Sequence, residues 1–348
     1  MRSYGVGVIG CGYWGPNLVR NFSRNPRTNV LAVCDSRHER AVRVAAEFRI
    51  PTVTDQANEL ITAPGVDLVV VATPSFTHFA LARAALEAGK HVLVMKPLTT
   101  SVDHAEELCD LAQRKGLLMA VDHTFVFTGA VRRMKALIDA GEIGDLYYFD
   151  SVRINLGLIQ TDINVVWDLA PHDVSIMDYL IDQEPVSVAA QAACHGGSPT
   201  ENIAYLTVRY AGSLLGAVHV NWLAPAKVRR TIVGGSKRMM IYDDMEPSEK
   251  LKVYDKGVSI SSDPTGESQE YQFMISYRSG DMHAPQLDMR EALAVEVENI
   301  VAALDGREPL VADGRGGARV VRILEAAQRS IEQGGALVAT SGPAPVGA

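Results

Sequence analysis

Near the start of the chain, six residues have the types and spacing needed to hold a phosphate group. The segment Gly10–Gly15 reads G-x-G-x-x-G, follows the strand-like run Val6–Ile9 and precedes the helical run Asn17–Phe22, which is the context that makes this string informative. The three glycines permit a tight turn, a close backbone approach to a pyrophosphate and close packing of helix on strand. Free N–H groups at the helix start would bind the phosphates. The alternative is a glycine-rich turn with no ligand. The loop residues predicted to contact a dinucleotide are Gly10, Gly12, Tyr13, Trp14 and Gly15.

The next strand-like run ends at Asp35. Its spacing from the glycines matches the acidic residue that accepts hydrogen bonds from the adenosine ribose hydroxyls. A carboxylate there repels a 2′-phosphate and favours NAD over NADP. Arg37 leaves NADP as an alternative cofactor, because a guanidinium can pair with that phosphate. Ser36 and Arg37 are both predicted to contact the cofactor. The alternative for Asp35 is an Asx turn after a strand.

A second turn is expected beside the cofactor, after the apolar run Leu68–Ala72. Its position at the end of a strand predicts contacts with the bound nucleotide. The other interpretation, which is compatible with the first, is a turn in which Ser75 or Thr77 caps the following helix. The residues of this turn predicted to contact the cofactor are Thr73, Pro74 and His78.

These motifs lie at the ends of apolar runs that alternate with helical segments through residues 1–122. Such alternation predicts a parallel sheet covered on both faces, and runs that are apolar throughout are typical of buried parallel strands. We therefore expect an α/β, doubly wound Rossmann domain over residues 1–122. The runs are Gly5–Ile9, Val30–Cys34, Leu68–Ala72, His91–Val94 and Leu117–Val121, and the helical stretches include Ala41–Phe48, Phe79–Ala88 and Ala105–Arg114.

After Asp122 the pattern changes. Residues 186–254 are mainly β in character, and Ala211-Gly212-Ser213 between two alternating runs predicts a hairpin. We expect an α+β domain with a largely antiparallel open sheet over residues 123–338, followed by a flexible tail at 339–348. Its other predicted elements are a strand at Leu146–Asn155 and helices at Ala130–Ala140, Leu169–Ile181, Leu287–Leu304 and Gly317–Glu332.

Composition narrows the class of protein. The 348 residues suit two domains, and the formal net charge of −8 argues against nonspecific nucleic-acid binding. No apolar run reaches the roughly 18 residues that span a bilayer, and the start of the chain has none of the parts of a signal peptide. The four cysteines are scattered, so neither a disulfide framework nor a zinc site is predicted. We expect a cytoplasmic protein with no nucleic-acid partner, no membrane partner and no metal.

Taken together, several motifs resemble the Gfo/Idh/MocA oxidoreductases. They are the glycine string, the turn from Ala72 to His78, Lys96-Pro97 after the apolar run His91–Val94, and Asp168-x-x-x-His172. The resemblance extends over nearly the whole chain. Further stretches are similar to the sugar-biosynthesis branch, which includes UDP-N-acetylglucosaminuronate 3-dehydrogenases and aminosugar and aminoglycoside dehydrogenases: Gly12–Leu18, His123–Phe125, Trp167–Asp173 and Tyr277–Asp281.

The resemblance implies an NAD(P)-dependent dehydrogenase or ketoreductase that moves a hydride to or from a ring carbon, often C3, of a sugar-like molecule. It also implies a homodimer or homotetramer, a cis Lys96-Pro97 bond, and cofactor contacts from Lys96 and Pro97. The family pattern is Glu-Lys-Pro, whereas this chain has Met95-Lys96-Pro97, so Lys96 is expected to have one charge partner fewer. Two alternatives stay open: an NAD-dependent glycosidase or lyase that recycles its hydride internally, and a non-catalytic cofactor-binding regulator.

The chemistry requires a base for the hydroxyl proton and a donor for the developing oxyanion. We assign the role of base or acid to His172, and that of substrate-hydroxyl partner and proton relay to Lys96. Asp168, which lies four residues before His172 and on the same helix face, is expected to orient the substrate or the base. Pro171 is expected in the first turn of that helix, so that His172 lies near the positive dipole end and is neutral. Structural uses, such as a helix cap by Asp168, are the alternative. The residues predicted from the resemblance to bind substrate are His123, Arg153, Asn155, Asn164, Trp167 and Arg278.

Overall fold

The first compact unit of the chain is built on a parallel sheet of six strands in the order β3-β2-β1-β4-β5-β6. The computed structural model describes residues 2–157, 163–262 and 273–340. Successive strands are added on one side of β1 and then on the other, so the switch point lies between β1 and β4, where a doubly wound sheet opens its ligand crevice. This is the predicted α/β fold. The strands are β1 (Tyr4–Ile9), β2 (Thr28–Cys34), β3 (Thr52–Thr54), β4 (Leu68–Val71), β5 (His91–Met95) and β6 (Met119–Asp122).

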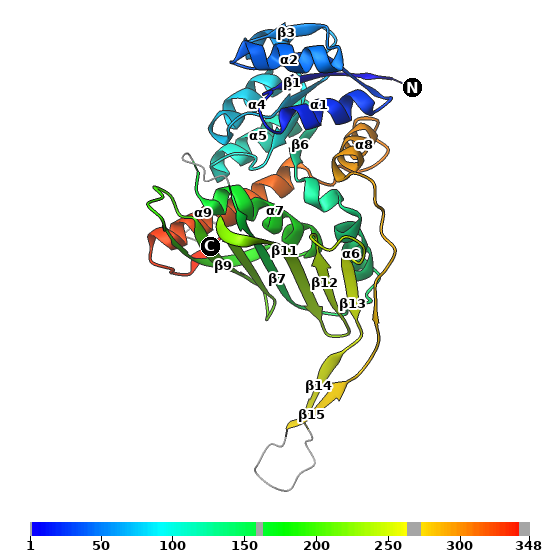
Figure 1. Cartoon of the computed structure of the whole chain (residues 1–348), viewed down its shortest axis with the longest axis vertical. Helices are drawn as coiled ribbons and strands as arrows, with labels where there is room; N and C mark the ends of the chain where they lie inside the picture. Colours follow the sequence, from blue (N-terminus) through cyan, green and yellow to red (C-terminus); the bar gives the residue numbers. More distant parts are fainter. Residues whose placement is uncertain (1, 158–162, 263–272, 341–348) are drawn as a thin grey trace. The chain divides into compact units, whose positions relative to one another are not determined.

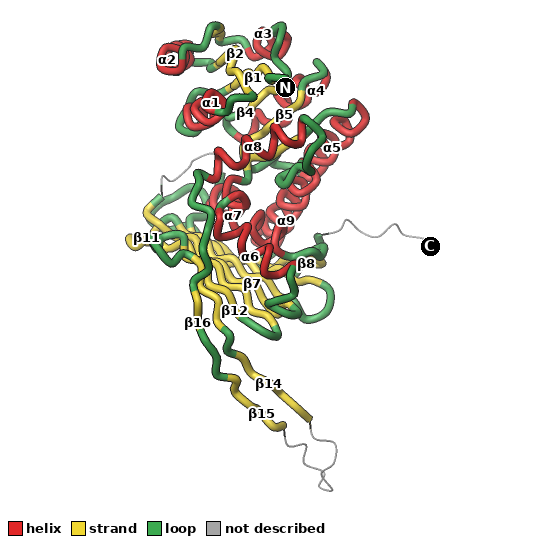
Figure 2. Tube along the Cα trace, turned by 90° about the vertical axis from the view of Figure 1, so that its right-hand side faces the viewer, coloured by secondary structure: helices red, strands yellow, loops and turns green. Residues whose placement is uncertain are grey.

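Helices cover both faces of this sheet (Figure 2). Alternate valines of each strand point to opposite faces, as the strand period of two requires: Val6 and Val8 pack with α1, α2 and α8, whereas Val69 and Val71 pack with α3, α4, α5 and α9. These side chains are fully buried. The helices are α1 (Gly15–Arg24), α2 (His38–Phe48), α3 (Ala57–Thr62), α4 (His78–Glu87), α5 (Val102–Lys115), α8 (Ala292–Leu304) and α9 (Gly314–Glu332), with short 3-10 helices η1 (Ser75–Thr77) and η2 (Thr124–Phe127).

Helices α8 and α9 belong to this unit although they come from the last fifth of the chain. The unit comprises residues 1–128, 166–179 and 289–329. Leu293, Val297 and Ile300 of α8 are part of the same buried cluster as β1, and Val321 of α9 is part of the cluster on the opposite face. The compact units therefore interleave along the sequence, whereas the division expected at residue 122 treats the chain as two contiguous stretches.

The second compact unit, residues 129–165, 180–288 and 330–348, is built on a sheet of nine strands in the order β16-β13-β12-β11-β7-β10-β9-β8-β17. All described neighbours are antiparallel except β7 and β10, so the predicted largely antiparallel sheet is confirmed. The elements are α6 (Gly129–Asp139), β7 (Leu146–Leu156), β8 (Pro185–Ala193), β9 (Ile203–Tyr210), β10 (Leu215–Asn221), β11 (Leu223–Gly235), β12 (Met239–Asp243), β13 (Leu251–Tyr254), β16 (Met282–His283) and β17 (Val338–Ala339).

The hairpin predicted around Gly212 is formed by β9 and β10. A separate two-stranded ribbon, β14 (Gly257–Ser262) with β15 (Phe273–Arg278), continues beyond β13 (Figure 1). At the other end, Val338 and Ala339 pair with β8, so Ala339 belongs to a strand and the predicted tail would begin later. Residues 341–348 of that tail lie outside the described residues.

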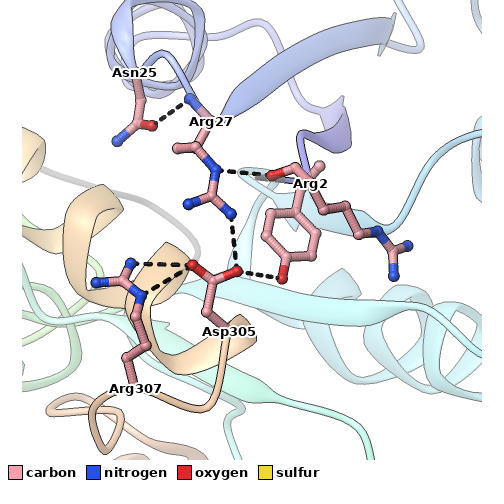
Figure 3. A network of polar contacts seen from close by, with 6 residues as sticks. Arg2, Asn25, Arg27, Asp305 and Arg307 are labelled. Carbon is pink, nitrogen blue, oxygen red and sulfur yellow. Dashed lines mark hydrogen bonds and ion pairs between the residues drawn. The ribbon is translucent and has the colours of Figure 1, made fainter.

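A polar network ties the end of α8 to the start of β1 (Figure 3). The Asp305 carboxylate accepts hydrogen bonds from the Tyr4 hydroxyl at 2.9 Å and from the Arg27 guanidinium at 2.9 Å. Arg307 donates to its other oxygen at 3.1 Å. The hydrogen bonds from Arg27 and Tyr4 lower the pKa of Asp305.

We expect Asp305→Asn to lower the melting temperature at pH 7, and the loss to shrink as the pH falls. Because the folded-state pKa of Asp305 lies below its unfolded value of about 3.9, this carboxylate stabilises the fold above the unfolded pKa, and the contribution disappears as the pH drops through the folded pKa. Thermal unfolding of both proteins between pH 7 and pH 3 checks this. Asp182→Asn, at an exposed position, is the control. A loss in melting temperature that does not change with pH would contradict the argument.

Candidate active site

The glycine loop between β1 and α1 has the backbone geometry of a pyrophosphate cradle. Gly10 has φ +103°, and a Cβ there would lie 2.3 Å from the Ala72 carbonyl oxygen. A Cβ on Gly15 would lie 2.0 Å from the Gly10 carbonyl oxygen. At Gly12, in contrast, the nearest atom to a Cβ would be a guanidinium nitrogen of Arg40 at 3.9 Å. The backbone is therefore closely packed behind the loop and open in front of Gly12, which fits a dinucleotide phosphate group at the start of α1.

Asp35, directly after β2, is joined to this loop. One carboxylate oxygen accepts the Cys11 backbone N–H at 2.8 Å and the other accepts the Arg37 backbone N–H at 2.9 Å. The side chain is 7% exposed. Each carboxylate oxygen has a second lone pair, so both can also accept ribose hydroxyls. The second of these bonds is the Asx turn considered as an alternative, and it coexists with an orientation suited to a ribose. Ser36 and Arg37 are exposed at the same turn.

Arg40, in the first turn of α2, was missed in the sequence analysis. Its guanidinium is the group nearest to the open side of Gly12. A cation three residues beyond Arg37 returns to the same side of a helix, and this spacing was the available signal. The arrangement places a positive charge where the phosphates of a dinucleotide are expected.

We expect Arg40→Ala to weaken NAD binding by about 3- to 10-fold. A charge-assisted contact to phosphate at a partly exposed site contributes roughly 1 kcal/mol, and about 1.4 kcal/mol corresponds to a tenfold change. Titration of the protein fluorescence with NADH measures the dissociation constant. Arg43→Ala, one turn away on an exposed part of α2, should leave it unchanged. Equal effects of the two substitutions would indicate only a long-range charge effect.

His78 holds the turn after β4 from its buried side. This side chain is 1% exposed, and its ring nitrogens lie 2.8 Å from the Pro97 carbonyl and 2.9 Å from the Thr73 carbonyl. Burial lowers its pKa. His78 therefore supports the turns that begin at Thr73 and Lys96, and its ring does not reach the surface. Helix α4 has no side-chain cap at Thr77, so the capping alternative was wrong.

At the end of β5, Lys96 meets Asp168 of α7 (Val165–Leu180). The Lys96 ammonium lies 2.6 Å from the Asp168 backbone carbonyl and 3.2 Å from its carboxylate oxygen. The side chains are 15% and 22% exposed. The bond between Lys96 and Pro97 is cis, as the resemblance implied. The sequence motifs at residues 96 and 168 are thus one ion pair at the carboxyl edge of the sheet.

Helix α7 begins earlier than expected, which corrects the account of His172. The Val165 N–H donates to the Glu201 carbonyl at 3.0 Å, and Val165 and Val166 are fully buried, so packing overrides their weak helix propensity. Pro171 consequently lies inside the helix and removes an intrahelical hydrogen bond there. His172 lies beyond the first turn, and the prediction that the positive dipole end keeps it neutral was wrong. The cap alternative for Asp168 was also wrong, because Asp168 belongs to the helix itself.

Two histidines lie around this ion pair. His172 is four residues from Asp168 on α7, and its ring meets the edge of Phe125 at 5.0 Å between centroids. His123, after β6, is 4% exposed, and neither of its ring nitrogens has a hydrogen-bond partner among the described residues. Burial and the positive charge of Lys96 lower the pKa of His123 to about 3. His123 is thus a neutral ring with an available donor and acceptor.

The remaining predicted residues are dispersed. Tyr13 is 92% exposed, Trp14 donates to Asp122 at 2.8 Å, and Trp167 is half-buried against the sheet. In the second unit, Arg153 is buried and Asn155 half-buried on β7. Asn164 donates to Glu201 at 3.0 Å, and Arg278 pairs with Asp255 at 3.2 Å. The cofactor contacts assigned to Tyr13 and Trp14 and the substrate contacts assigned to the others stay predictions.

Two global observations concern the residues that the structure describes. Within ranges 2–157, 163–262 and 273–340, no group of three or more His, Cys, Asp or Glu side chains is arranged to hold a metal ion. In the same ranges, no helix is both long and apolar enough to cross a membrane.

Comparisons with known proteins identify the family. Residues 4–123 match the family described as oxidoreductase with an NAD-binding Rossmann fold, GFO/IDH/MocA, and residues 131–241 match its C-terminal domain. The chain is 30% identical, over 91% of its length and 93% of the relative's, to UDP-N-acetylglucosamine 3-dehydrogenase of Acidithiobacillus ferrooxidans. The chain belongs to the Gfo/Idh/MocA family. This Gfo/Idh/MocA protein is an oxidoreductase with an NAD-binding domain.

Solved structures of other family members have the same fold. The UDP-N-acetylglucosamine 3-dehydrogenase GnnA of Acidithiobacillus ferrooxidans matches with a TM-score of 0.81 at 26% identity, covering 96% of this chain and 99% of that one. GenD2 from gentamicin A biosynthesis, in complex with NAD, matches with a TM-score of 0.81 at 23% identity, covering 98% and 97%. The second likeness concerns the fold alone.

Proposed function

We propose that this protein transfers a hydride between NAD and a ring hydroxyl or the matching ketone, at C3, of a sugar, nucleotide sugar or aminoglycoside. The observation that carries the proposal is the Lys96 ammonium held 2.6 Å from the Asp168 carbonyl at the carboxyl edge of a dinucleotide-binding sheet. The relative most informative about substrate is a UDP-N-acetylglucosamine 3-dehydrogenase, which supports both a nucleotide sugar and C3.

The hydride, the proton and the negative charge that the reaction moves indicate a role for each residue. NAD, when bound, accepts the hydride from the carbinol carbon. The hydroxyl proton must go to a base as the C–O bond becomes a carbonyl. His172 takes this proton, Lys96 donates to the oxygen while negative charge develops on it, and Asp168 fixes the direction of Lys96. The reverse reaction uses the same groups with the proton returned by His172. The substrate contact predicted for His123 stays a prediction, because both of its ring nitrogens are buried in the free protein.

The test is nicotinamide absorbance with NAD or NADP and a panel of UDP-sugars, aminoglycosides, inositols and aldoses. One substrate group should produce NADH, and His172→Ala should lower kcat by about 10²-fold. His104→Ala is the matched control, because His104 also contacts a phenylalanine ring, that of Phe79, but is exposed on α5. Product formation without a change in absorbance would instead identify internal hydride recycling. NADH binding without turnover of any substrate would identify a regulator.

Two further features stay predictions. The predicted homodimer or homotetramer is checked by light scattering of the purified protein. The preference for NAD over NADP depends on Asp35, whose carboxylate is directed into the glycine loop, and it is checked by comparing kcat/KM for the two cofactors.

A further inference from the structure

Two buried carboxyl groups in the first unit have no place in the proposed reaction. Asp122 is the last residue of β6 and is 2% exposed, and Glu296 of α8 is 1% exposed. Acidic side chains are almost never fully buried unless they are paired. The surroundings of each group therefore need an explanation.

Asp122 is surrounded by donors. One carboxylate oxygen accepts the Trp14 indole N–H at 2.8 Å. The other accepts the Thr124 backbone N–H at 3.1 Å and also the Thr124 hydroxyl. Three donors of this kind suit an ionised carboxylate. All the donors that hold Asp122 therefore come from Trp14 and Thr124.

Glu296 is the neutral one of the two carboxyl groups. Its carboxyl lies next to that of Asp122, although neither of its oxygens forms a hydrogen bond of good geometry with a described residue. Burial, and then the negative charge of Asp122, raise its pKa well above the usual range. When two carboxyl groups share a buried site, one of them keeps its proton. Glu296 therefore contributes no charge that would compete with Asp122 for the indole.

Trp14 connects the pair to the cofactor loop. It is the residue immediately before α1, and its indole packs against the same buried cluster as Ala72 and Met95. These two residues lie at the ends of β4 and β5, the strands that separate β1 from β6 in the sheet. The indole therefore joins the glycine loop to Asp122 at the end of β6 and packs against the same cluster as the ends of β4 and β5. In a doubly wound sheet the half of the crevice over β4, β5 and β6 takes the second mononucleotide, because the adenosine half lies over β2 with Asp35.

We propose that Asp122 and Glu296 are positioning residues that hold the Trp14 indole as a fixed wall for the nicotinamide half of NAD. This inference rests on NAD binding by the proposed function but does not depend on the identity of the sugar. Asp122 acts through its bond to the indole N–H. Glu296 acts through Asp122, because the two carboxyl groups interact.

Binding of NADH and of ADP-ribose, measured by calorimetry, tests the proposal without any sugar substrate. ADP-ribose has the adenosine and both phosphates but no nicotinamide. Trp14→Phe removes the indole N–H together with part of the ring, and Asp122→Ala removes the acceptor of that N–H together with its two contacts to Thr124. Each should weaken NADH binding at least tenfold and change ADP-ribose binding less than twofold. The loss in the double variant should be smaller than the product of the two single losses, because both changes remove the bond between the indole and the Asp122 carboxylate.

Variants of Glu296 complete the test. Glu296→Ala should weaken NADH binding, and Glu296→Gln, which has the shape of the neutral acid, should recover most of it. The control Glu298→Gln changes an exposed acid on the same helix, paired with Arg290, and should have no effect. Equal loss of ADP-ribose and NADH binding, additive effects of the Trp14 and Asp122 changes, or no recovery in Glu296→Gln would each overturn the proposal. Failure of the sugar panel with this binding pattern intact would overturn only the proposed function.

Discussion

Lys96→Ala should lower kcat by about 10²- to 10⁴-fold, the contribution of a positioned acid or base, and change NAD binding only a few-fold. The reason is geometric. The ammonium is held at the end of β5 by both the carbonyl and the carboxylate of Asp168, so it is directed to one place before substrate binds. Steady-state kinetics with the substrate found by the panel, together with NADH titration, separate the two effects.

Lys90→Ala is the matched control for this prediction. Lys90 is also partly buried and also donates to a backbone carbonyl, that of Val66 at 2.8 Å, but it precedes β5, whereas Lys96 follows it. Its loss should leave kcat within about twofold of the wild-type value, since substitutions away from a site rarely change stability or function much. Equal losses of kcat in both variants would show that Lys96 has only a structural role.

Met95 replaces the acid of the Glu-Lys-Pro pattern, but Lys96 still pairs with a carboxylate. Met95 packs its side chain into the apolar cluster that also contacts Trp14. The acid that pairs with Lys96 comes from α7 instead, at 3.2 Å. Lys96 therefore lacks a charge partner at residue 95, as expected, but it has one in the carboxylate of Asp168.

The fold was predictable where burial makes a strand apolar along its whole length. Strands β1, β4 and β5 were found within one residue of their bounds because both faces of the sheet are covered. Strand β3 (Thr52–Thr54) and helix α3 (Ala57–Thr62) were missed, since three and six residues are too few for a periodic pattern. The packing of α8 on β1 was not predictable either, because the hydrophobic pattern of a helix does not indicate which sheet it covers.

The site was predictable where backbone geometry or chemistry restricts the residue type. Glycine is required at Gly10 and Gly15, and the spacing of Asp168 and His172 follows the helix period. Arg40 and Asp122 were not found, because an arginine on a helix and an aspartate after a strand have many ordinary uses. The dipole argument for His172 failed because the start of α7 is set by a hydrogen bond to Glu201, a residue distant in the sequence.

Gly12→Ala should weaken NAD binding by roughly 10- to 100-fold, the effect of forcing one methyl group into a close contact. In the free protein the added Cβ would meet nothing closer than the flexible Arg40 guanidinium at 3.9 Å. The melting temperature should therefore stay within about 2 °C of the wild-type value. The substitution thus blocks the place of the pyrophosphate without disturbing the loop. NADH titration and thermal unfolding measure the two quantities.

Gly15→Ala provides the contrast that makes this result interpretable. Its Cβ would lie 2.0 Å from the Gly10 carbonyl oxygen, so the loop itself must move, and both the melting temperature and NAD binding should fall. If Gly12→Ala also lowered the melting temperature by a similar amount, its loss of binding would reflect a damaged loop. If Gly12→Ala bound NAD as well as the wild type, the phosphates would not lie against this glycine. Only weaker binding at unchanged stability places the cofactor in front of Gly12.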